Sequence, residues 1–449
     1  MKTPIYDFVK KYSATDTVRL HMPGHKGKGR LGVECLDITE ISGADVLYGA
    51  SGIIAESEEN ATSLFKSAHT FYLTEGSTLG IKAMLALALS DAVGEKRRPI
   101  VLAARNAHKA FINSAALLDF SVEWLYPSES EHLCKCNVTP LDLENKLSAM
   151  ERLPEAVYVT SPDYLGNMAD IKGLSEICDR YGIPLLVDNA HGAYLAFLTP
   201  SEHPISLGAS MCADSAHKTL PVLTGGAYLH ISKKAEKYIP RARAMLSLLA
   251  STSPSYLTLQ SLDLCNEYLA SDYSERLSKT VAKVDNLKRE LSSLGYSFEG
   301  DERLKLVIWA NKYGYTGTEI ADFLREYSIE IEFYDRELAV MMFTPENSDG
   351  DYARILSALS LLSRHDRVSD GAFDLSAPHT SACSIREAAF SPSETISVED
   401  AVGRICAQST VSCPPAVPIA VSGEIITKED LTLFKKYGIT EVEVIKNGK

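Results

Sequence analysis

The sequence predicts an α/β fold in which a mostly parallel sheet is covered by helices on both faces. Two observations carry this prediction: short apolar runs typical of buried strands recur along the chain, and segments of helical periodicity separate them. The expected strands are 100–103, 156–160, 183–187 and 225–231. One expected helix begins at Ser77, and others cover 107–118 and 173–181. Strands that alternate with helices favour parallel pairing, because a crossover between parallel strands needs a long connection.

The length of 449 residues and the changes of pattern along the chain predict several domains. We expect an N-terminal arm at 1–35, a large domain at 36–270, a small α+β domain at 271–365, and a linker with a C-terminal domain at 366–449. The arm is polar and glycine-rich, which favours a loop over a core element. Within the last two domains we expect helices at 271–295, 317–327 and 398–407 and strands at 305–310 and 338–343.

Composition is that of an ordinary globular protein, with 45% hydrophobic and 23% charged residues. The net charge of −14 argues against a nucleic-acid partner, because phosphate binding requires a basic face. The same charge would mildly favour a cationic substrate, although solubility is the more ordinary reason for it. No apolar run reaches the roughly 18 residues of a membrane span. The N-terminus also lacks the pattern of a signal peptide.

The nine cysteines are scattered and odd in number, which indicates reduced thiols in a cytoplasmic protein. The closest cluster with a histidine is His132, Cys134 and Cys136. It lacks the second pair of ligands that a structural zinc site requires. We therefore expect no metal site.

A phosphate-binding helix start is expected at Gly76, Ser77 and Thr78, ahead of an apolar helix. Backbone N–H groups and hydroxyls at the positive end of a helix dipole bind phosphate. An ordinary N-cap is the simpler interpretation of these three residues taken alone. A phosphate site becomes the favoured interpretation because other residues of the chain suit the same phosphate-bearing ligand.

Those other residues follow the expected strands. Asp188 ends the strand at 183–187, where ligands of open α/β sheets bind, and could pair with a protonated pyridine nitrogen. Lys218 lies between apolar flanks that would keep its amine partly neutral, as a Schiff-base lysine requires. His108 could stack on a ring or cap the next helix. Together with the phosphate site, these residues suit pyridoxal 5'-phosphate (PLP).

Several ordered segments carry a resemblance over nearly the whole chain. They are HMPGHKGKG (21–29), DITEISGAD (37–45), TEGSTLGIKAM (74–84), ARNAHKA (104–110), VTSPDYLG (159–166), IPLLVDNAHGAY (183–194), DSAHKTLPVLTGGAYLHI (214–231), STSPSYLTLQSLD (251–263), and the pair REAAFSP and EDAVGRICAQ. The chain resembles the prokaryotic ornithine/lysine/arginine decarboxylases, in their shorter Gram-positive form. The resemblance implies the aspartate-aminotransferase-like fold of PLP-dependent transferases, with an extra C-terminal domain.

The resemblance also implies a role for each site residue. Lys218 would hold PLP as a Schiff base, and the neighbouring His217 would touch the phosphate or assist protonation. The remaining residues would bind the cofactor: Gly76, Ser77, Thr78 and Ser215 at the phosphate, Asp188 at the pyridine nitrogen, His108 and Ala190 on the two ring faces with His191 close by, and Thr252 from the neighbouring subunit. A homodimer or larger homo-oligomer is therefore expected.

Some segments depart from the family pattern. Asp45-Val46-Leu47-Tyr48 stands where the family commonly has Asp-Asp-Leu-His, Cys413-Pro-Pro-Ala-Val-Pro418 and Ser422-Gly423-Glu424 replace two further family motifs, and Asp163 stands where a neutral residue is expected. The distal cation of a basic substrate would need a carboxylate such as Asp45 or Glu424. An ordinary surface acid is the slightly favoured interpretation of both. The choice among arginine, lysine and ornithine stays open.

The reaction that the resemblance implies is decarboxylation of one of these basic amino acids, as in cytoplasmic polyamine biosynthesis. The same cofactor residues would serve an aminotransferase or another lyase equally well. A catalytically degenerate regulator is a third alternative. The retention of Lys218, Asp188 and His217 together argues against it.

Overall fold

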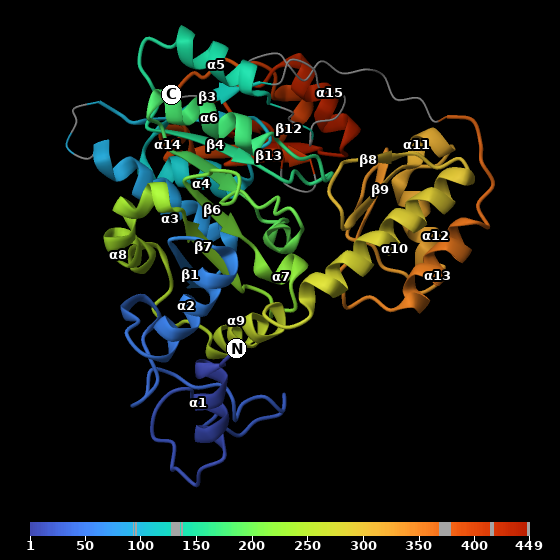
Figure 1. Ribbon diagram of the computed structural model, residues 1–449. Coiled ribbons are helices and arrows are strands. Elements are labelled where there is room, and N and C mark those ends of the chain that lie inside the picture. Colours follow the sequence, from blue (N-terminus) through green and yellow to red (C-terminus); the bar gives the residue numbers. More distant parts are fainter. Residues whose placement is uncertain are drawn as a thin grey trace. The chain divides into compact units, whose positions relative to one another are not determined.

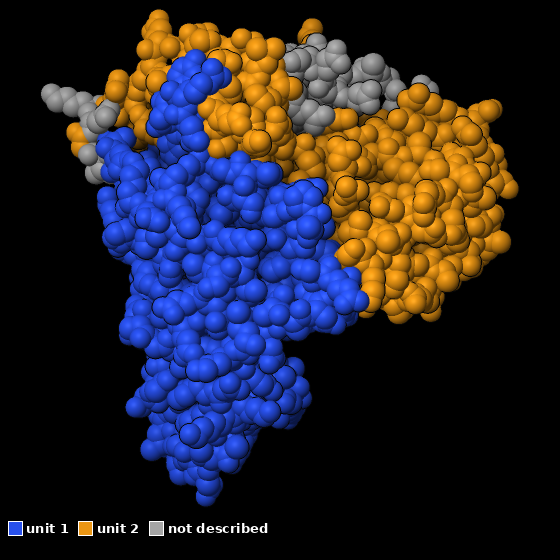
Figure 2. Space-filling view, in the orientation of Figure 1, with its two compact units in different colours: residues 1–93, 178–277 blue, residues 94–177, 278–449 orange. Residues whose placement is uncertain are grey.

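The computed structural model describes residues 1–92, 94, 97–126, 135, 138–367, 379–413 and 417–446. The chain divides into two compact units, the first made of residues 1–93 and 178–277 and the second of residues 94–177 and 278–449 (Figure 2). Residues His132, Cys134 and Cys136 and positions 368–378 of the expected linker lie outside the described residues.

The large sheet has seven strands in the order β1-β7-β6-β5-β4-β2-β3 (Figure 1). Their bounds are β1 (His69–Leu73), β2 (Ile100–Ala104), β3 (Ser121–Leu125), β4 (Ala156–Thr160), β5 (Leu185–Asp188), β6 (Met211–Asp214) and β7 (Ala227–Ile231). In the first unit, β5 and β6 are parallel while β7 is antiparallel to both β6 and β1. In the second unit, β2 is parallel to β3 and to β4. The expected strands at 100–103, 156–160, 183–187 and 225–231 are confirmed to within two residues at each end.

Helices of the first unit pack on this sheet and on one another. They are α1 (Pro4–Ser13), α2 (Ile53–Phe65), α3 (Ser77–Leu89), α7 (Ala216–Thr219), α8 (Ile239–Leu249) and α9 (Tyr256–Leu269), and the chain changes unit within α6 (Ile171–Tyr181) and α10 (Tyr273–Ser293). Helix α3 lies against β6 and β7. A Cβ atom on Gly80 would stand 2.9 Å from Cβ of Ala213 and 3.0 Å from Cδ1 of Leu73. The absence of a side chain at Gly80 therefore sets how closely α3 approaches the sheet.

The N-terminal segment contributes to the core, contrary to the expectation of a loop throughout 1–35. Helix α1 buries Ile5 and Val9 completely and contacts α2 and α9. The backbone N–H groups of Ile5 and Tyr6 each donate to Oδ2 of the buried Asp263 at 2.9 Å. The prediction missed this helix because it treated the segment together with the polar, glycine-rich residues that follow, although Ile5 and Val9 have helical i, i+4 spacing.

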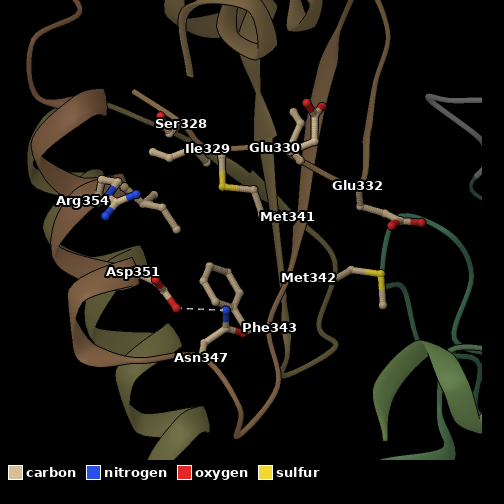
Figure 3. Close-up of a pocket in the computed structure, with 12 residues that line it drawn as sticks. Ser328, Ile329, Glu330, Glu332, Met341, Met342, Phe343, Asn347, Asp351 and Arg354 are labelled. Atoms are coloured by element: carbon tan, nitrogen blue, oxygen red, sulfur yellow. Dashed lines mark hydrogen bonds between the residues drawn. The ribbon is translucent and has the colours of Figure 1, made fainter. Parts of the chain in front are cut away.

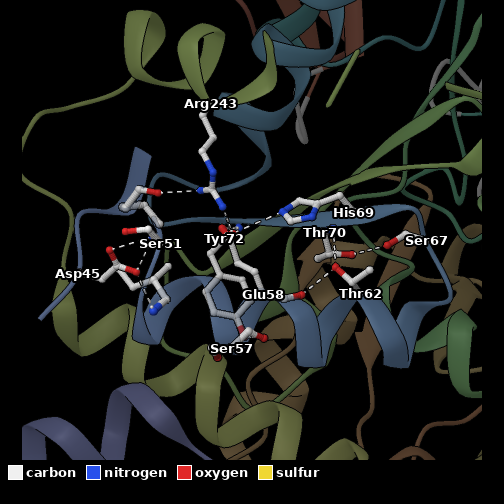
Figure 4. Close-up of polar contacts among 12 residues, drawn as sticks. Asp45, Ser51, Ser57, Glu58, Thr62, Ser67, His69, Thr70, Tyr72 and Arg243 are labelled. Carbon is white, nitrogen blue, oxygen red and sulfur yellow. Dashed lines mark hydrogen bonds and ion pairs between the residues drawn. The ribbon is translucent and has the colours of Figure 1, made fainter. Parts of the chain in front are cut away.

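A buried carboxylate joins α2, β1 and α8 (Figure 4). Glu58 is fully buried, and its Oε2 lies 2.6 Å from Nη2 of Arg243 and 3.5 Å from Nε2 of His69. Its other oxygen accepts the backbone N–H of Tyr72 at 3.0 Å. A carboxylate removed from water needs such partners, so Glu58 fixes the position of these elements.

The second unit contains a four-stranded sheet in the order β10-β11-β9-β8. Its strands are β8 (Phe298–Glu299), β9 (Lys305–Trp309), β10 (Phe333–Tyr334) and β11 (Leu338–Met342), and the helices near it are α11 (Ala310–Tyr313), α12 (Gly317–Glu326) and α13 (Asp349–Leu359). One apolar core joins residues from 284 to 362. The expected helices at 271–295 and 317–327 and the expected strands at 305–310 and 338–343 are confirmed.

The second unit also contains further helices and two pairs of strands. They are α4 (Lys109–Leu118), α5 (Pro140–Ala149), α14 (Ile385–Phe390), α15 (Lys428–Lys436), β12 (Ser393–Ser397), β13 (Thr410–Cys413), β14 (Val417–Val421) and β15 (Glu441–Ile445). The strands form the pairs β12–β15 and β13–β14. The expected helix at 398–407 is wrong, because Gly403 has a φ of +84° and the backbone of Cys406 donates to Glu424 rather than to a helical turn. Among the described residues, no helix combines the length and apolar character needed to cross a bilayer.

We predict that Gly80→Ala lowers the free energy of unfolding by about 1–3 kcal/mol, because the new methyl group overlaps Ala213. In an open helix the same change would stabilise by about 1 kcal/mol. Gly350→Ala in α13 is the matched control, since the nearest atom to its Cβ lies 3.6 Å away. Denaturant unfolding of both variants gives the comparison. Equal or greater stability of Gly80→Ala would contradict the close approach of α3 to β6.

Candidate cofactor site

The start of α3 presents hydroxyl and backbone donors. Gly76 has a φ of +70°, which glycine adopts readily, and its N–H donates to the carbonyl of Gly225 at 2.7 Å. Ser77 is the first residue of the helix and is buried, and Ser215 donates a 2.8 Å hydrogen bond to its hydroxyl. Thr78 follows and is half-buried. Two hydroxyls thus meet at the positive end of a thirteen-residue helix, an arrangement that suits a phosphate.

Lys218 lies three residues beyond Ser215, within the short helix α7. It is half-buried, and its Nζ lies 3.1 Å from Nε2 of His191, which is 5% exposed. The Nδ1 atom of the adjacent His217 lies 3.0 Å from the carbonyl oxygen of Gly226, a contact that orients its ring. The amine of Lys218 is therefore held by the segment that follows β5.

Asp188 ends β5 and is 2% exposed. Its Oδ1 accepts the backbone N–H of Ala190 at 3.2 Å, which fixes the turn leading to His191. The next residue, Asn189, donates from Nδ2 to Oδ1 of Asp214 at 2.7 Å. The ends of β5 and β6 are thereby joined, with Asp188 and Lys218 on the two joined segments.

A buried network next to this site was not predicted from the sequence. The Oδ2 atom of Asp214 lies 2.9 Å from Nε2 of His203 and 3.2 Å from Nε2 of His230. Burial alone would raise the pKa of Asp214, but the charges and hydrogen bonds of the two histidines hold it well below its usual range. The sequence offers one indication of this network, the alternation of Cys212 and Asp214 along a short strand. That alternation does not predict which histidines lie opposite them.

Two predicted site residues have other surroundings. His108 belongs to the second unit, where its Nδ1 accepts the backbone N–H of Ala110 at 3.2 Å and caps α4. Capping was one of its two expected roles, and the cofactor role stays a prediction. Thr252 is exposed in the first unit, beside Ser251, whose N–H donates to Glu75 at 2.7 Å. The predicted contact of Thr252 with a neighbouring subunit is not tested by one chain.

The interpretation of Asp45 and Glu424 as surface acids is wrong, because both are buried. Asp45 is 8% exposed and accepts several backbone N–H groups, the shortest from Gly52 at 2.7 Å. Glu424 is 1% exposed, and its two oxygens accept from Nη1 and Nη2 of Arg105 at 2.6 and 2.8 Å. The guanidinium of Arg105 also lies 4.7 Å from the ring centre of Trp124. Both carboxylates are therefore engaged by the fold itself.

Asp163, which stands where a neutral residue was expected, is also buried. Both of its carboxylate oxygens accept from Asn167, at 2.8 and 2.9 Å, and its carbonyl accepts from Lys305 at 3.1 Å. Burial raises the pKa of Asp163 to about 6, against the opposing effect of these hydrogen bonds and of the Lys305 charge. The carboxyl group is thus still mostly ionised at neutral pH and becomes mostly protonated only below about pH 6.

A pocket of about 430 Å³ in the second unit contains none of the predicted site residues (Figure 3). It is lined by residues of β11 and α13 and of the segment at 328–332, among them Met341, Phe343 and Arg354. The amide of Asn347 donates to Asp351 across one side of it. Lys218 and Asp188 lie in the first unit instead.

Comparison with known proteins identifies the class to which this α/β fold belongs. The solved structure of the Francisella novicida lysine decarboxylase LdcF matches with a TM-score of 0.81 at 15% identity, covering 99% of this chain and 81% of that one. The constitutive lysine decarboxylase of E. coli matches with a TM-score of 0.77 at 17% identity, covering 99% and 82%. These likenesses confirm the expected fold, that of the aspartate-aminotransferase-like enzymes.

The family follows from the sequence. The major-domain profile of the Orn/Lys/Arg decarboxylases matches residues 3–306, and the profile of their C-terminal domain matches residues 375–438. The chain belongs to this family, as the resemblance indicated. It is similar to the arginine decarboxylase of Bacillus subtilis (strain 168), at 28% identity over 97% of this chain and 93% of that protein. The arginine decarboxylase of Halalkalibacterium halodurans is 29% identical over the same shares.

We predict that Glu424→Gln lowers the free energy of unfolding by about 3 kcal/mol, because it leaves the Arg105 charge buried opposite a neutral amide. Glu394→Gln is the control, since it removes a more exposed ion pair with Arg404 and should change stability by less than about 1 kcal/mol. Denaturant unfolding measures both. A variant at 424 with normal stability and a raised substrate KM would instead make Glu424 a substrate contact.

We predict that Asp163 makes stability fall as the pH rises. Its folded pKa, about 6, lies above its ordinary value of 3.8. Its stabilising contribution is therefore complete below about pH 4 and is lost as the pH rises through about 6. Asp163→Asn should remove roughly 3 kcal/mol of this pH dependence. Unfolding free energies of both proteins between about pH 4 and pH 7 test this, and parallel curves would refute the raised pKa.

Proposed function

We propose that this chain is a PLP-dependent decarboxylase that converts a basic amino acid to the corresponding amine and CO₂. The observation that carries the proposal is the pair of hydrogen bonds that link Ser77 to Ser215 and Lys218 to His191, at 2.8 and 3.1 Å. Through them, the helix start, the lysine and the segment after Asp188 form one group of side chains. Full-length similarity to arginine decarboxylases supports arginine as the first substrate to test.

The residues present fit the chemical groups of PLP. A phosphate would be held by the hydroxyls of Ser77, Thr78 and Ser215 and by backbone N–H groups at the start of α3. A covalent bond to the aldehyde would come from the amine of Lys218. An acid for the pyridine nitrogen would come from Asp188, whose burial would strengthen that ion pair. His108 and Ala190 remain the candidates for contacts with the ring faces.

Each of the candidate-site residues would then have a definite task. When bound, PLP supplies an electron sink for the pair released as the bond between Cα and the carboxylate breaks. Asp188 would hold a proton on the ring nitrogen. His191, within hydrogen-bond reach of Lys218, would accept a proton from that amine and so keep it nucleophilic. Lys218, or His217 beside it, would deliver the proton to Cα.

The wider setting of the enzyme is part of the same proposal. We place it in the cytoplasm as a homodimer or larger homo-oligomer, with the exposed Thr252 completing the phosphate site of a neighbouring subunit. Its product would enter polyamine biosynthesis. We also propose that the chain is organised as an arm, a large domain, a small domain and a C-terminal domain.

We predict that the purified protein releases CO₂ from at least one of arginine, lysine and ornithine, with arginine fastest. Lys218→Ala should lower kcat by roughly three orders of magnitude or more, because covalent attachment and proton delivery are lost together. Lys233→Ala, an exposed lysine of the same unit, should retain full activity. Release of CO₂ from none of the three amino acids would refute decarboxylation. Formation of an oxo acid would indicate aminotransfer.

A further inference from the structure

We propose that His203, Cys212, Asp214 and His230 form a structural metal site, for which Zn²⁺ is the best-fitting ion. All four side chains are completely buried, and their ligand atoms lie within 4.8 Å of one another. The proposal goes beyond decarboxylation, since no step of that reaction needs it. It also departs from the expectation, drawn from the sequence alone, that the chain has no metal site.

The sheet brings three of the four ligands to one face. Cys212 and Asp214 are two residues apart on β6, so their side chains point to the same side. His230 on β7 is the direct cross-strand partner of Cys212. His203 reaches them from the segment before β6, where its Nε2 lies 3.9 Å from Sγ of Cys212.

The spacing of the ligand atoms suits a tetrahedral ion. Zinc bonds of about 2.0–2.3 Å place tetrahedral ligands roughly 3.3–3.8 Å apart. Here Oδ2 of Asp214 lies 2.9 and 3.2 Å from the two Nε2 atoms, and Sγ of Cys212 lies 3.9 Å from Nε2 of His203. All other pairs of ligand atoms lie within 4.8 Å, so movements of no more than about 1 Å would complete the coordination.

The chemistry of the donor set also favours zinc. Two imidazoles, one thiolate and one carboxylate are ligands that Zn²⁺ accepts, whereas Mg²⁺ and Ca²⁺ require oxygen ligands. The thiolate and the carboxylate together would neutralise a divalent ion in this buried place. Four protein ligands leave no open position, so the site would be structural rather than catalytic.

Outer contacts hold these ligands in the orientation that a metal requires. Oδ1 of Asp214, the oxygen turned away from the imidazoles, accepts from Asn189 at 2.7 Å. Nδ1 of His230 lies 2.8 Å from Oγ1 of Thr70. That hydroxyl in turn lies 2.8 Å from Oγ of Ser67 (Figure 4). Hydrogen bonds of this kind to the second nitrogen of a histidine are usual around protein-bound metals.

The alternative is a network held by hydrogen bonds only. In it, Asp214 would accept from both histidines and from Asn189, and the thiol of Cys212 would stay protonated. The backbone N–H of Ile205 lies 3.4 Å from Nδ1 of His203, a long contact that the metal-bound tautomer would give up. The two arrangements differ in metal content and in the state of Cys212, so both can be measured.

The test is the metal content of the full-length protein, purified without chelator and also after reconstitution with Zn²⁺ or Co²⁺ alone. We expect about one ion per chain, as in a closed structural site. With Co²⁺ we expect the visible absorption of tetrahedral coordination and a thiolate charge-transfer band. Cys212→Ser should abolish that band, and Thr70→Val should weaken binding about 10- to 100-fold.

Cys178→Ser is the control, because Cys178 is a buried thiol of the same unit outside the cluster. It should keep the metal and the charge-transfer band. Wild-type protein that is folded yet binds less than about a tenth of an equivalent of either ion would overturn the proposal. A Co²⁺ band that survives in Cys212→Ser would also overturn the assigned ligands. Neither readout depends on PLP or on decarboxylation, so this proposal can fail while the proposed function stands.

Discussion

The candidate site depends on one contact, the hydrogen bond between the amine of Lys218 and the imidazole of His191. It joins the segment after β6 to the segment after β5, and hence the lysine to the acid at Asp188. The hydroxyls of Ser215 and Ser77 make the second connection, to the start of α3. Because parallel strands end at the same edge of a sheet, residues about 30 and 140 positions from Lys218 reach one place.

Several carboxylates are buried within each of the two units. Glu58 joins α2, β1 and α8, and Asp214 joins the strands that carry the candidate site. In the second unit, Glu424 and Arg105 hold the end of β2 against the C-terminal segment. Each buried acid is matched by several donors, as burial of a carboxylate demands. Such networks specify where each element lies, and in the first unit the bond from Asn189 to Asp214 joins the strand ends next to Asp188 and Lys218.

Most strands of the large sheet were predictable from the sequence, whereas the roles of the candidate-site residues stay predictions. Strand β4 begins and ends where its apolar run does, and α3 begins at Ser77 as expected. Helix α1 was missed because the glycine-rich residues that follow it favoured a loop, although its buried residues Ile5 and Val9 have helical spacing. The helix expected at 398–407 fails because partners far along the chain take its backbone groups. The Asp214 network was missed because its partners depend on the register between β6 and β7, which the local sequence pattern does not predict.

The central claim is the covalent role of Lys218, and borohydride reduction of the purified, PLP-loaded protein tests it most directly. After proteolysis, mass spectrometry should find the reduced pyridoxyl group on the peptide that contains Lys218, in near-stoichiometric amount. The yellow absorption of the protein should disappear at the same rate. A label on another lysine, or no label on a folded protein supplied with PLP, would contradict the account.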